Sequence, residues 1–207
     1  MRRRPVIVYI SLFFVTAIAL YYQIVEESFL FAFCDEDCLV EWATVAFYLL
    51  AAYLFIFKKK GWKNLWNYLL ASLFFLIAGE EISWGQRVFQ FKVPKAIKQI
   101  NVQREFNLHN LEFFQGIIRS AGVLVFCILC LIIPLTNRFS ERCRHWYAKM
   151  RIPIFPLDAS VVVAVAMTLM IVPRIFLSRT IFNLDEIGEM YLAAAMFIFA
   201  LDQTERS

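Results

Sequence analysis

Long apolar runs alternate with short polar segments along the whole chain. Five runs approach or exceed the roughly 20 apolar residues that a helix needs to cross a bilayer. They cover residues 6–25, 39–57, 64–82, 113–135 and 158–177. A sixth run, 188–201, is short, and we include it because Ile181 and Ile187 can extend it. The pattern predicts an all-α polytopic membrane helix bundle of about six transmembrane helices, forming one integral membrane domain over residues 1–207.

Composition and charge agree with this class of protein and give it an orientation. Of the 207 residues, 61% are hydrophobic and 22 are phenylalanine, as is typical of a polytopic membrane protein. Lysine and arginine are enriched in cytoplasmic loops. Here they cluster before the first run, between the second and third, and between the fourth and fifth. With six spans these clusters share one side, so we expect both termini to face the cytoplasm.

The acidic residues fall mainly on the opposite, outer side of this topology. Thirteen of the 17 Asp and Glu residues lie there, at helix ends or in loops. Solvation accounts for most of them, but Glu41, Glu80 and Glu81 adjoin or interrupt apolar helix. A carboxylate in an apolar medium is costly unless it is protonated or paired. These three residues therefore need a structural or functional reason.

The loop at residues 88–112 breaks the charge pattern, because it carries lysines on the side that should be poor in cations. Pro94 suits the first turn of a helix. Three apolar residues share one face at helical spacing: Val93, Ile97 and Ile100. Lys95 and Lys98 project from the opposite face. The pattern predicts a short interfacial helix whose lysines lie near lipid phosphates, with an ordinary basic loop as the alternative.

The stretch GEEISWGQR, residues 79–87, places two adjacent carboxylates at the end of the third apolar run. If the helix continues through this stretch, Glu80, Trp84 and Arg87 share one face. Glu81 then points about 100° away. One carboxylate would pair with Arg87, directly or through a ligand, and the other would face a neighbouring helix.

The stretch EFNLHNLE, residues 105–112, is the second candidate. If it is helical, Glu105, His109 and Glu112 form a stripe that leads into the fourth run. His109 is the one histidine expected on the outer side, which excludes a three-histidine zinc site. An oxygen-rich site for Mg²⁺, Mn²⁺ or Ca²⁺ remains open, with Glu81, Glu105 and His109 as candidate ligands.

A metal-free site is the other possibility, in which a glutamate and His109 act as general base and acid. We therefore expect Glu80 or Glu81 to approach His109. For any single residue of these stretches, a purely structural role between helices is the alternative. Together, ionisable residues at membrane depth favour a functional site.

Further candidates lie around these stretches. We expect substrate contacts from aromatic, polar and cationic residues: Trp84, Lys95, Lys98, Asn110 and Arg174. Intramembrane arginine is costly and usually faces a partner or a cavity. Cys34 and Cys38 are a candidate disulfide in an oxidising exterior, for which the first outer loop must be irregular.

The succession of VEWATVAFYLLAA, GEEISWGQRVF and INVQREFNLHNLEFF resembles a widespread set of uncharacterised bacterial polytopic membrane proteins, over about residues 26–116. The resemblance implies a bacterial cytoplasmic (inner) membrane location and names no reaction. A more distant similarity is to intramembrane glutamic endopeptidases of the CAAX-processing type. It implies that Glu80, Glu81 and Arg87 stand for that family's first motif, and His109 with Asn110 for later ones. Arg87 follows the glutamates at a greater distance than in that family.

Three functions are compatible with these candidates. The first is a membrane-embedded hydrolase or transferase acting on a lipid, lipid-linked or peptide substrate, with Glu80 or Glu81 activating water, His109 exchanging protons and Arg87 stabilising negative charge. The second is a proton- or cation-coupled transporter. The third is a non-catalytic membrane partner subunit. The expected partners are the lipid bilayer and a lipid or lipid-linked substrate, and not nucleic acid.

The six-span topology predicts opposite locations for Lys60 and Lys95. A membrane-impermeant thiol reagent should label Lys95→Cys in intact cells and Lys60→Cys only after permeabilisation. The unsubstituted chain measures the background from the native cysteines. Labelling of both positions from the same side would contradict the six-span arrangement.

Overall fold

Helices form most of the computed structural model of the chain, which describes residues 9–14, 16–18, 21, 39–58, 65–113, 115–176 and 183–205. Those residues contain no β-strand, so the predicted all-α class is confirmed. The elements in chain order are α3 (Leu39–Tyr53), η1 (Leu54–Lys58), α4 (Leu65–Glu81), η2 (Ser83–Gly85), α5 (Gln86–Phe89), α6 (Lys95–Ile100), α7 (Gln115–Cys127), η3 (Ile128–Ile132), α8 (Ile133–Phe139), α9 (Glu141–Lys149), α10 (Ser160–Phe176) and α11 (Asn183–Glu205).

Among the residues that the structure describes, two helices are long and apolar enough to cross a membrane, which indicates membrane association by length and composition. One, Leu39–Phe57, spans α3 and most of η1, and the other, Ala121–Phe139, spans most of α7 together with η3 and α8; each has 19 residues. Helices α4 and α10 have 17 residues each. The arrangement of six spans therefore stays a prediction.

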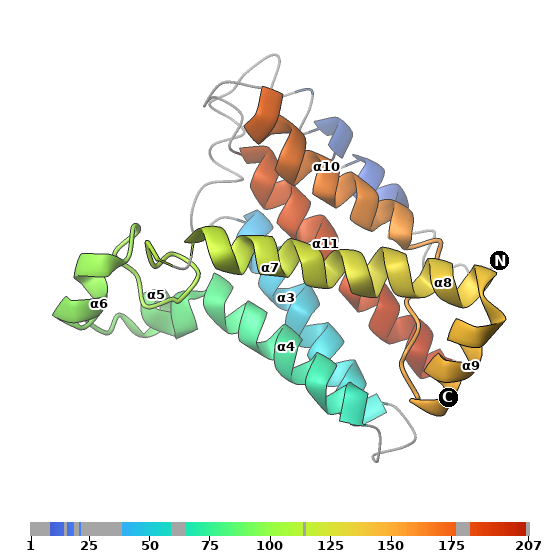
Figure 1. Cartoon of the computed structure of the whole chain (residues 1–207). Coiled ribbons are helices and arrows are strands. Elements are labelled where there is room, and N and C mark those ends of the chain that lie inside the picture. Colours follow the sequence, from blue (N-terminus) through green and yellow to red (C-terminus); the bar gives the residue numbers. More distant parts are fainter. Residues whose placement is uncertain are drawn as a thin grey trace.

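Helix α11 lies in the middle of the bundle, where it packs against α3 and α10 (Figure 1). Its middle is made of small residues, and Ala193, Ala194 and Ala195 have no exposed surface. A Cβ atom on Gly188 would stand 2.9 Å from the carbonyl oxygen of Ala166 in α10. Small residues thus let the two helix backbones come close, as in membrane helix pairs generally.

An aromatic cluster joins η1 and α4 to α11. The ring of Phe55 lies 6.0 Å from that of Phe74 and 5.3 Å from that of Phe199, centroid to centroid. Phe155 adds a further contact, 5.2 Å from Phe199. Such offset and edge-on pairs contribute about 0.5–1.5 kcal/mol each beyond the burial of their area. They fasten η1 and α4 to α11.

A proline shapes the helix made of α7, η3 and α8. Pro134 has no N–H, so it leaves the carbonyl of Cys130 without its usual donor four residues on. The chain is π-helical just before the proline, at Ile128–Ile132. The hydroxyl of Ser160 in α10 donates to the Cys130 carbonyl at 2.7 Å. A side chain from a neighbouring helix thereby satisfies a backbone group that apolar surroundings would otherwise leave unpaired.

Short helices occupy opposite ends of the bundle: α5 and α6 lie beyond one end and α9 lies at the other (Figure 1). The predicted short helix is confirmed as α6, which begins directly after Pro94. Lys95 and Lys98 are exposed, whereas Val93 and Ile97 are half-buried. The position of α6 at a lipid interface stays a prediction.

Replacing Gly188 by alanine should weaken the packing of α10 on α11. The added Cβ would lie 2.6 Å from the Cγ of Met170, as well as against the Ala166 carbonyl, and overpacking of this kind costs about 1–3 kcal/mol. Thermal unfolding of the purified protein in detergent measures the loss. Gly122→Ala is the matched control, because a Cβ there meets nothing within 4 Å. Equal stability of the two variants would refute the close approach.

Candidate functional site

Helix α4 ends in an unusual turn. After Glu81 the chain has three consecutive residues with positive φ: Ser83 at 45°, Trp84 at 54° and Gly85 at 78°. The expectation that this helix continues through Arg87 is therefore wrong. A left-handed conformation costs a non-glycine residue roughly 1–2 kcal/mol, so Ser83 and Trp84 need compensating contacts.

Trp84 finds those contacts by folding back onto α4. Its Nε1 donates to Oε1 of Glu80 at 2.7 Å, and its ring packs edge-on against Phe75. A Cβ on Gly79 would stand 3.0 Å from the indole. Glycine at position 79 thus leaves room for the ring. The expected proximity of Trp84 to Glu80 exists, but it is produced by the turn of left-handed residues and not by a continuous helix.

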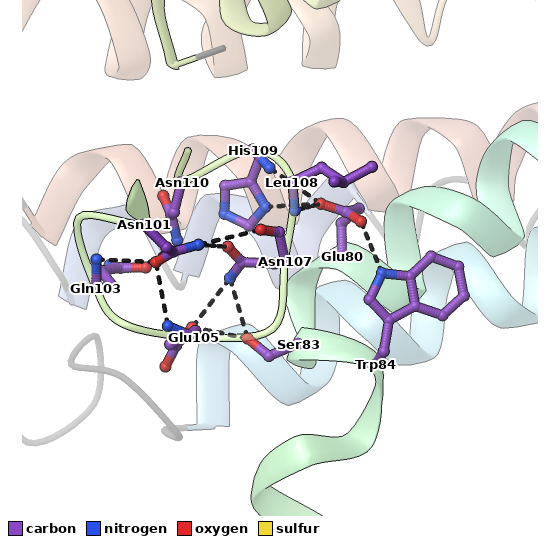
Figure 2. A network of polar contacts seen from close by, with 10 residues as sticks. All are labelled: Glu80, Ser83, Trp84, Asn101, Gln103, Glu105, Asn107, Leu108, His109 and Asn110. Carbon is purple, nitrogen blue, oxygen red and sulfur yellow. Dashed lines mark hydrogen bonds and ion pairs between the residues drawn. The ribbon is translucent and has the colours of Figure 1, made fainter. Parts of the chain in front are cut away.

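The carboxylate of Glu80 joins α4 to the loop that follows α6 (Figure 2). Its Oε2 accepts hydrogen bonds from the backbone N–H groups of Leu108 at 2.6 Å and His109 at 3.0 Å. Nδ1 of His109 lies 3.5 Å from the same oxygen. The predicted approach of Glu80 or Glu81 to His109 is confirmed, and Glu80 is the one that makes it. Bonds from several donors to one carboxylate are of the strong, charge-assisted kind, and they fix both the loop and the imidazole.

A second carboxylate, Glu105, lies in a separate part of the same network. Ser83 donates its hydroxyl hydrogen to Oε2 of Glu105 at 2.7 Å. The amide of Asn107 donates both to that oxygen and to the Ser83 hydroxyl, each at 3.0 Å. All three side chains are buried. These bonds supply the compensation that the left-handed backbone of Ser83 requires.

Asn101 organises the loop from within (Figure 2). Its Oδ1 accepts the backbone N–H groups of Gln103 at 3.0 Å and Glu105 at 3.1 Å. Its Nδ2 donates to the side-chain oxygen of Asn107 at 2.8 Å and to the backbone carbonyl of that residue at 3.0 Å. Asparagine commonly binds the backbone two residues on and so builds a turn. The side chain is 4% exposed, so these bonds are shielded from water.

The helix on which the stripe at residues 105–112 depends is absent, because this stretch is a loop closed by an isolated bridge between Asn101 and Leu111. Four of its N–H groups, those of Glu105, Phe106, Leu108 and His109, bind side-chain oxygens where a helix would use carbonyl oxygens. Phe106 donates to Oε1 of Gln86 at 2.6 Å, and the next donors are the Glu80-bound amides. Polar side chains that compete for the backbone in this way disfavour helix. The stripe of Glu105, His109 and Glu112 therefore does not form.

Asn110 belongs to this network, because it is buried and donates to Gln103 within the loop. Other candidates lie apart from it. Lys95 and Lys98 are exposed on α6. Glu81 is half-buried, and its electrostatic neighbours besides Glu80 are carboxylates of other helices: Glu41, Glu186 and Glu189.

The candidate metal ligands are not brought together. Over the described ranges, no three or more His, Cys, Asp or Glu side chains are grouped to hold a metal ion, so Glu81, Glu105 and His109 do not form such a site. The side chains of Arg87 and Arg174, and the proposed disulfide of Cys34 and Cys38, lie outside the described residues.

Sequence reasoning missed the residues that hold the site together: Ser83, Gln86, Asn101 and Asn107. Each carries a neutral polar side chain, and no charge or periodicity marks it. The one available signal is the density of amides in NVQREFNLHN, which is typical of a turn-rich loop and not of a helix. That signal predicts a loop but does not identify which partners the amides bind.

Protein-family models, curated proteins and solved structures were each compared with the chain, and none of them matches it. The resemblance to bacterial polytopic membrane proteins stays a prediction. The function is therefore argued from the geometry of the residues.

Asn101→Asp should loosen the loop, although the two side chains have nearly the same volume. The substitution keeps the acceptor for two N–H groups but removes the donor to Asn107, and an unsatisfied buried group costs about 1–3 kcal/mol. Hydrogen exchange of the peptide covering residues 101–112 should speed up roughly 5- to 150-fold. Gln99→Glu, the same change of amide to carboxylate at an exposed position, should leave exchange unaltered. Unchanged protection in Asn101→Asp would show that Asn101 does not hold the loop.

Proposed function

We propose that the chain is a membrane-embedded hydrolase or transferase in which His109 exchanges protons with the reacting groups. Glu80 is then a positioning residue, because its carboxylate is already engaged by Trp84, Leu108 and His109. This refines the sequence-based expectation, in which a glutamate activates water directly. The substrate class remains a lipid, lipid-linked or peptide substrate.

The observation that carries the proposal is the pairing of Glu80 with a half-exposed imidazole. Nδ1 of His109 faces the carboxylate at 3.5 Å, and the His109 side chain is 39% exposed whereas that of Glu80 is 18% exposed. Within the described residues, Nε2 of His109 makes no hydrogen bond. A carboxylate on one imidazole nitrogen orients the ring and leaves the other nitrogen for a substrate.

The reaction follows from this geometry. Nε2 takes a proton from water or from an acceptor hydroxyl, and the oxygen attacks an ester, amide or phosphoryl centre. The Glu80 carboxylate stabilises the imidazolium that forms. Nε2 then returns the proton to the leaving oxygen or nitrogen as the bond to it breaks. Proton exchange by a positioned side chain accelerates such reactions by about 10²–10⁴-fold. Arg87 remains the proposed group for stabilising the developing negative charge.

The rigid turn at Ser83 and Trp84 supports a functional reading of this end of α4. Backbone held in left-handed conformation by surrounding bonds is concentrated at sites that must present groups in a defined geometry. We further propose that the chain crosses a bacterial inner membrane six times with both termini inside. The network then faces the exterior, at the end of the third span.

A proton- or cation-coupled carrier is the second candidate, and one observation favours it. Glu81 interacts electrostatically with carboxylates from α3 and α11, namely Glu41, Glu186 and Glu189. Carboxylates that influence one another across neighbouring helices are groups that carriers use to exchange protons. In that function Glu81, and not His109, would be the essential residue.

His109→Gln separates these functions. We expect the variant to lose about 10²–10⁴-fold of the activity, so that comparative lipid and small-molecule profiling of membranes shows accumulated substrate and no product. His145→Gln in α9 is the matched control and should resemble the unsubstituted protein. Profiles that are equal for His109→Gln and the unsubstituted chain would remove the enzyme proposal. Loss of proton or cation flux on Glu81→Gln alone would replace it by the carrier.

A further inference from the structure

Residues 83–113 form a segment that extends beyond the end of the helix bundle (Figure 1). This segment exposes many large apolar side chains. Phe89 is 78% exposed and Phe113 is 76% exposed. Four further apolar residues of the segment are more than half exposed: Val88, Ile100, Val102 and Leu108. Water-exposed loops do not normally carry such a set, so the segment requires an apolar partner.

The same segment is basic. It contains Arg87, Lys92, Lys95, Lys98 and Arg104 against only two acidic residues, Glu105 and Glu112. Glu105 is buried in the Asn107 and Ser83 network. The three lysines are exposed and have no ion-pair partner among the described residues. The exposed surface of the segment therefore combines aromatic and aliphatic side chains with uncompensated positive charge.

This combination distinguishes between environments. Residues within the hydrocarbon core should lack lysine, and residues in water should lack so many exposed aromatic side chains. Aromatic rings together with lysines are characteristic of the headgroup zone of a bilayer, where the rings reach the acyl chains and the lysines reach lipid phosphates. The hydrogen bonds of Asn101 and Glu80 hold the backbone of the segment in place, so the surface is ordered before it meets its partner.

We propose that the 83–113 segment is a docking surface for anionic phospholipids of the leaflet that it faces, with Phe89 entering the acyl boundary and Lys92, Lys95 and Lys98 binding headgroup phosphates. This goes beyond the proposed reaction, because it requires no catalysis. It also places His109 at the depth of lipid headgroups, since the imidazole belongs to the same ordered segment. Each lysine near an anionic surface strengthens binding about fivefold.

Photo-crosslinking of the full-length protein tests the surface. Phe89 or, in a second variant, Val102 is replaced by p-benzoylphenylalanine, and the protein is reconstituted in phosphatidylcholine vesicles containing phosphatidylglycerol. Intact-protein mass spectrometry then identifies the attached lipid. We expect phosphatidylglycerol adducts well above the mole fraction of that lipid. With Lys92, Lys95 and Lys98 all changed to glutamine, lipid adducts should persist, but in proportion to lipid composition.

Leu76 is the matched control, because it is 50% exposed in α4 and lies in an apolar run without nearby lysines. The probe at Leu76 should attach lipid without headgroup preference. Lipid adducts at Leu76 but none at Phe89 or Val102 would overturn the proposal. Crosslinks between two copies of the chain at both positions would identify a protein interface instead. Phosphatidylglycerol enrichment that survives the triple glutamine change would refute the role of the lysines.

Discussion

The end of helix α4 is the constraint on which the arrangement of the candidate site depends. The helix stops at Glu81, and three residues with positive φ follow before α5 begins. This turn brings the Trp84 indole back over Gly79 and points the Ser83 hydroxyl into the following loop. A helix that continued would carry these groups away from the loop. Glu80 would then have neither Trp84 in this position nor a segment 105–112 placed to receive its hydrogen bonds.

The loop after α6 shows how buried polar groups can define one conformation. Its amides bind Asn101, Gln86 and Glu80, and its buried carboxylate binds Ser83 and Asn107. Each buried polar group left without a partner would cost about 1–3 kcal/mol. Any alternative conformation of this loop that breaks one of these bonds is therefore destabilised. The result is a loop without regular structure that nevertheless presents a histidine in a defined position. Rigid support of this kind is what a proton-transferring group requires.

The helix bundle follows the same rule in an apolar setting. Pro134 frees the carbonyl of Cys130, and Ser160 from the neighbouring helix supplies the missing donor. Gly188 and the buried alanines of α11 bring backbones close enough for dispersion contacts to hold the helices together. Polar satisfaction and close backbone approach therefore add specificity to the contacts of α10 with α11 and with η3. Glu80 and Glu81 adjoin in sequence but have different surroundings. Glu80 binds the loop that carries His109, whereas Glu81 interacts with carboxylates of α3 and α11.

The sequence by itself determined the helical class, the short helix after Pro94 and the approach of Glu80 or Glu81 to His109, and the structure shows that Glu80 is the one. Hydrophobic runs, a proline at a first turn and acidic residues at a helix end are local signals, and local physics is enough to interpret them. Only the tertiary structure decided the rest. Periodicity was compatible with a helix through Arg87 and another over residues 105–112. It shows which residues would share a helix face, but it contains no information on hydrogen bonds to partners distant in the sequence. The left-handed turn at Ser83 and the loop that follows α6 are held by bonds between residues about 20 positions apart. Ser83 binds the side chains of Glu105 and Asn107, and Gln86 accepts the backbone N–H of Phe106. These bonds are defined only once the chain has folded.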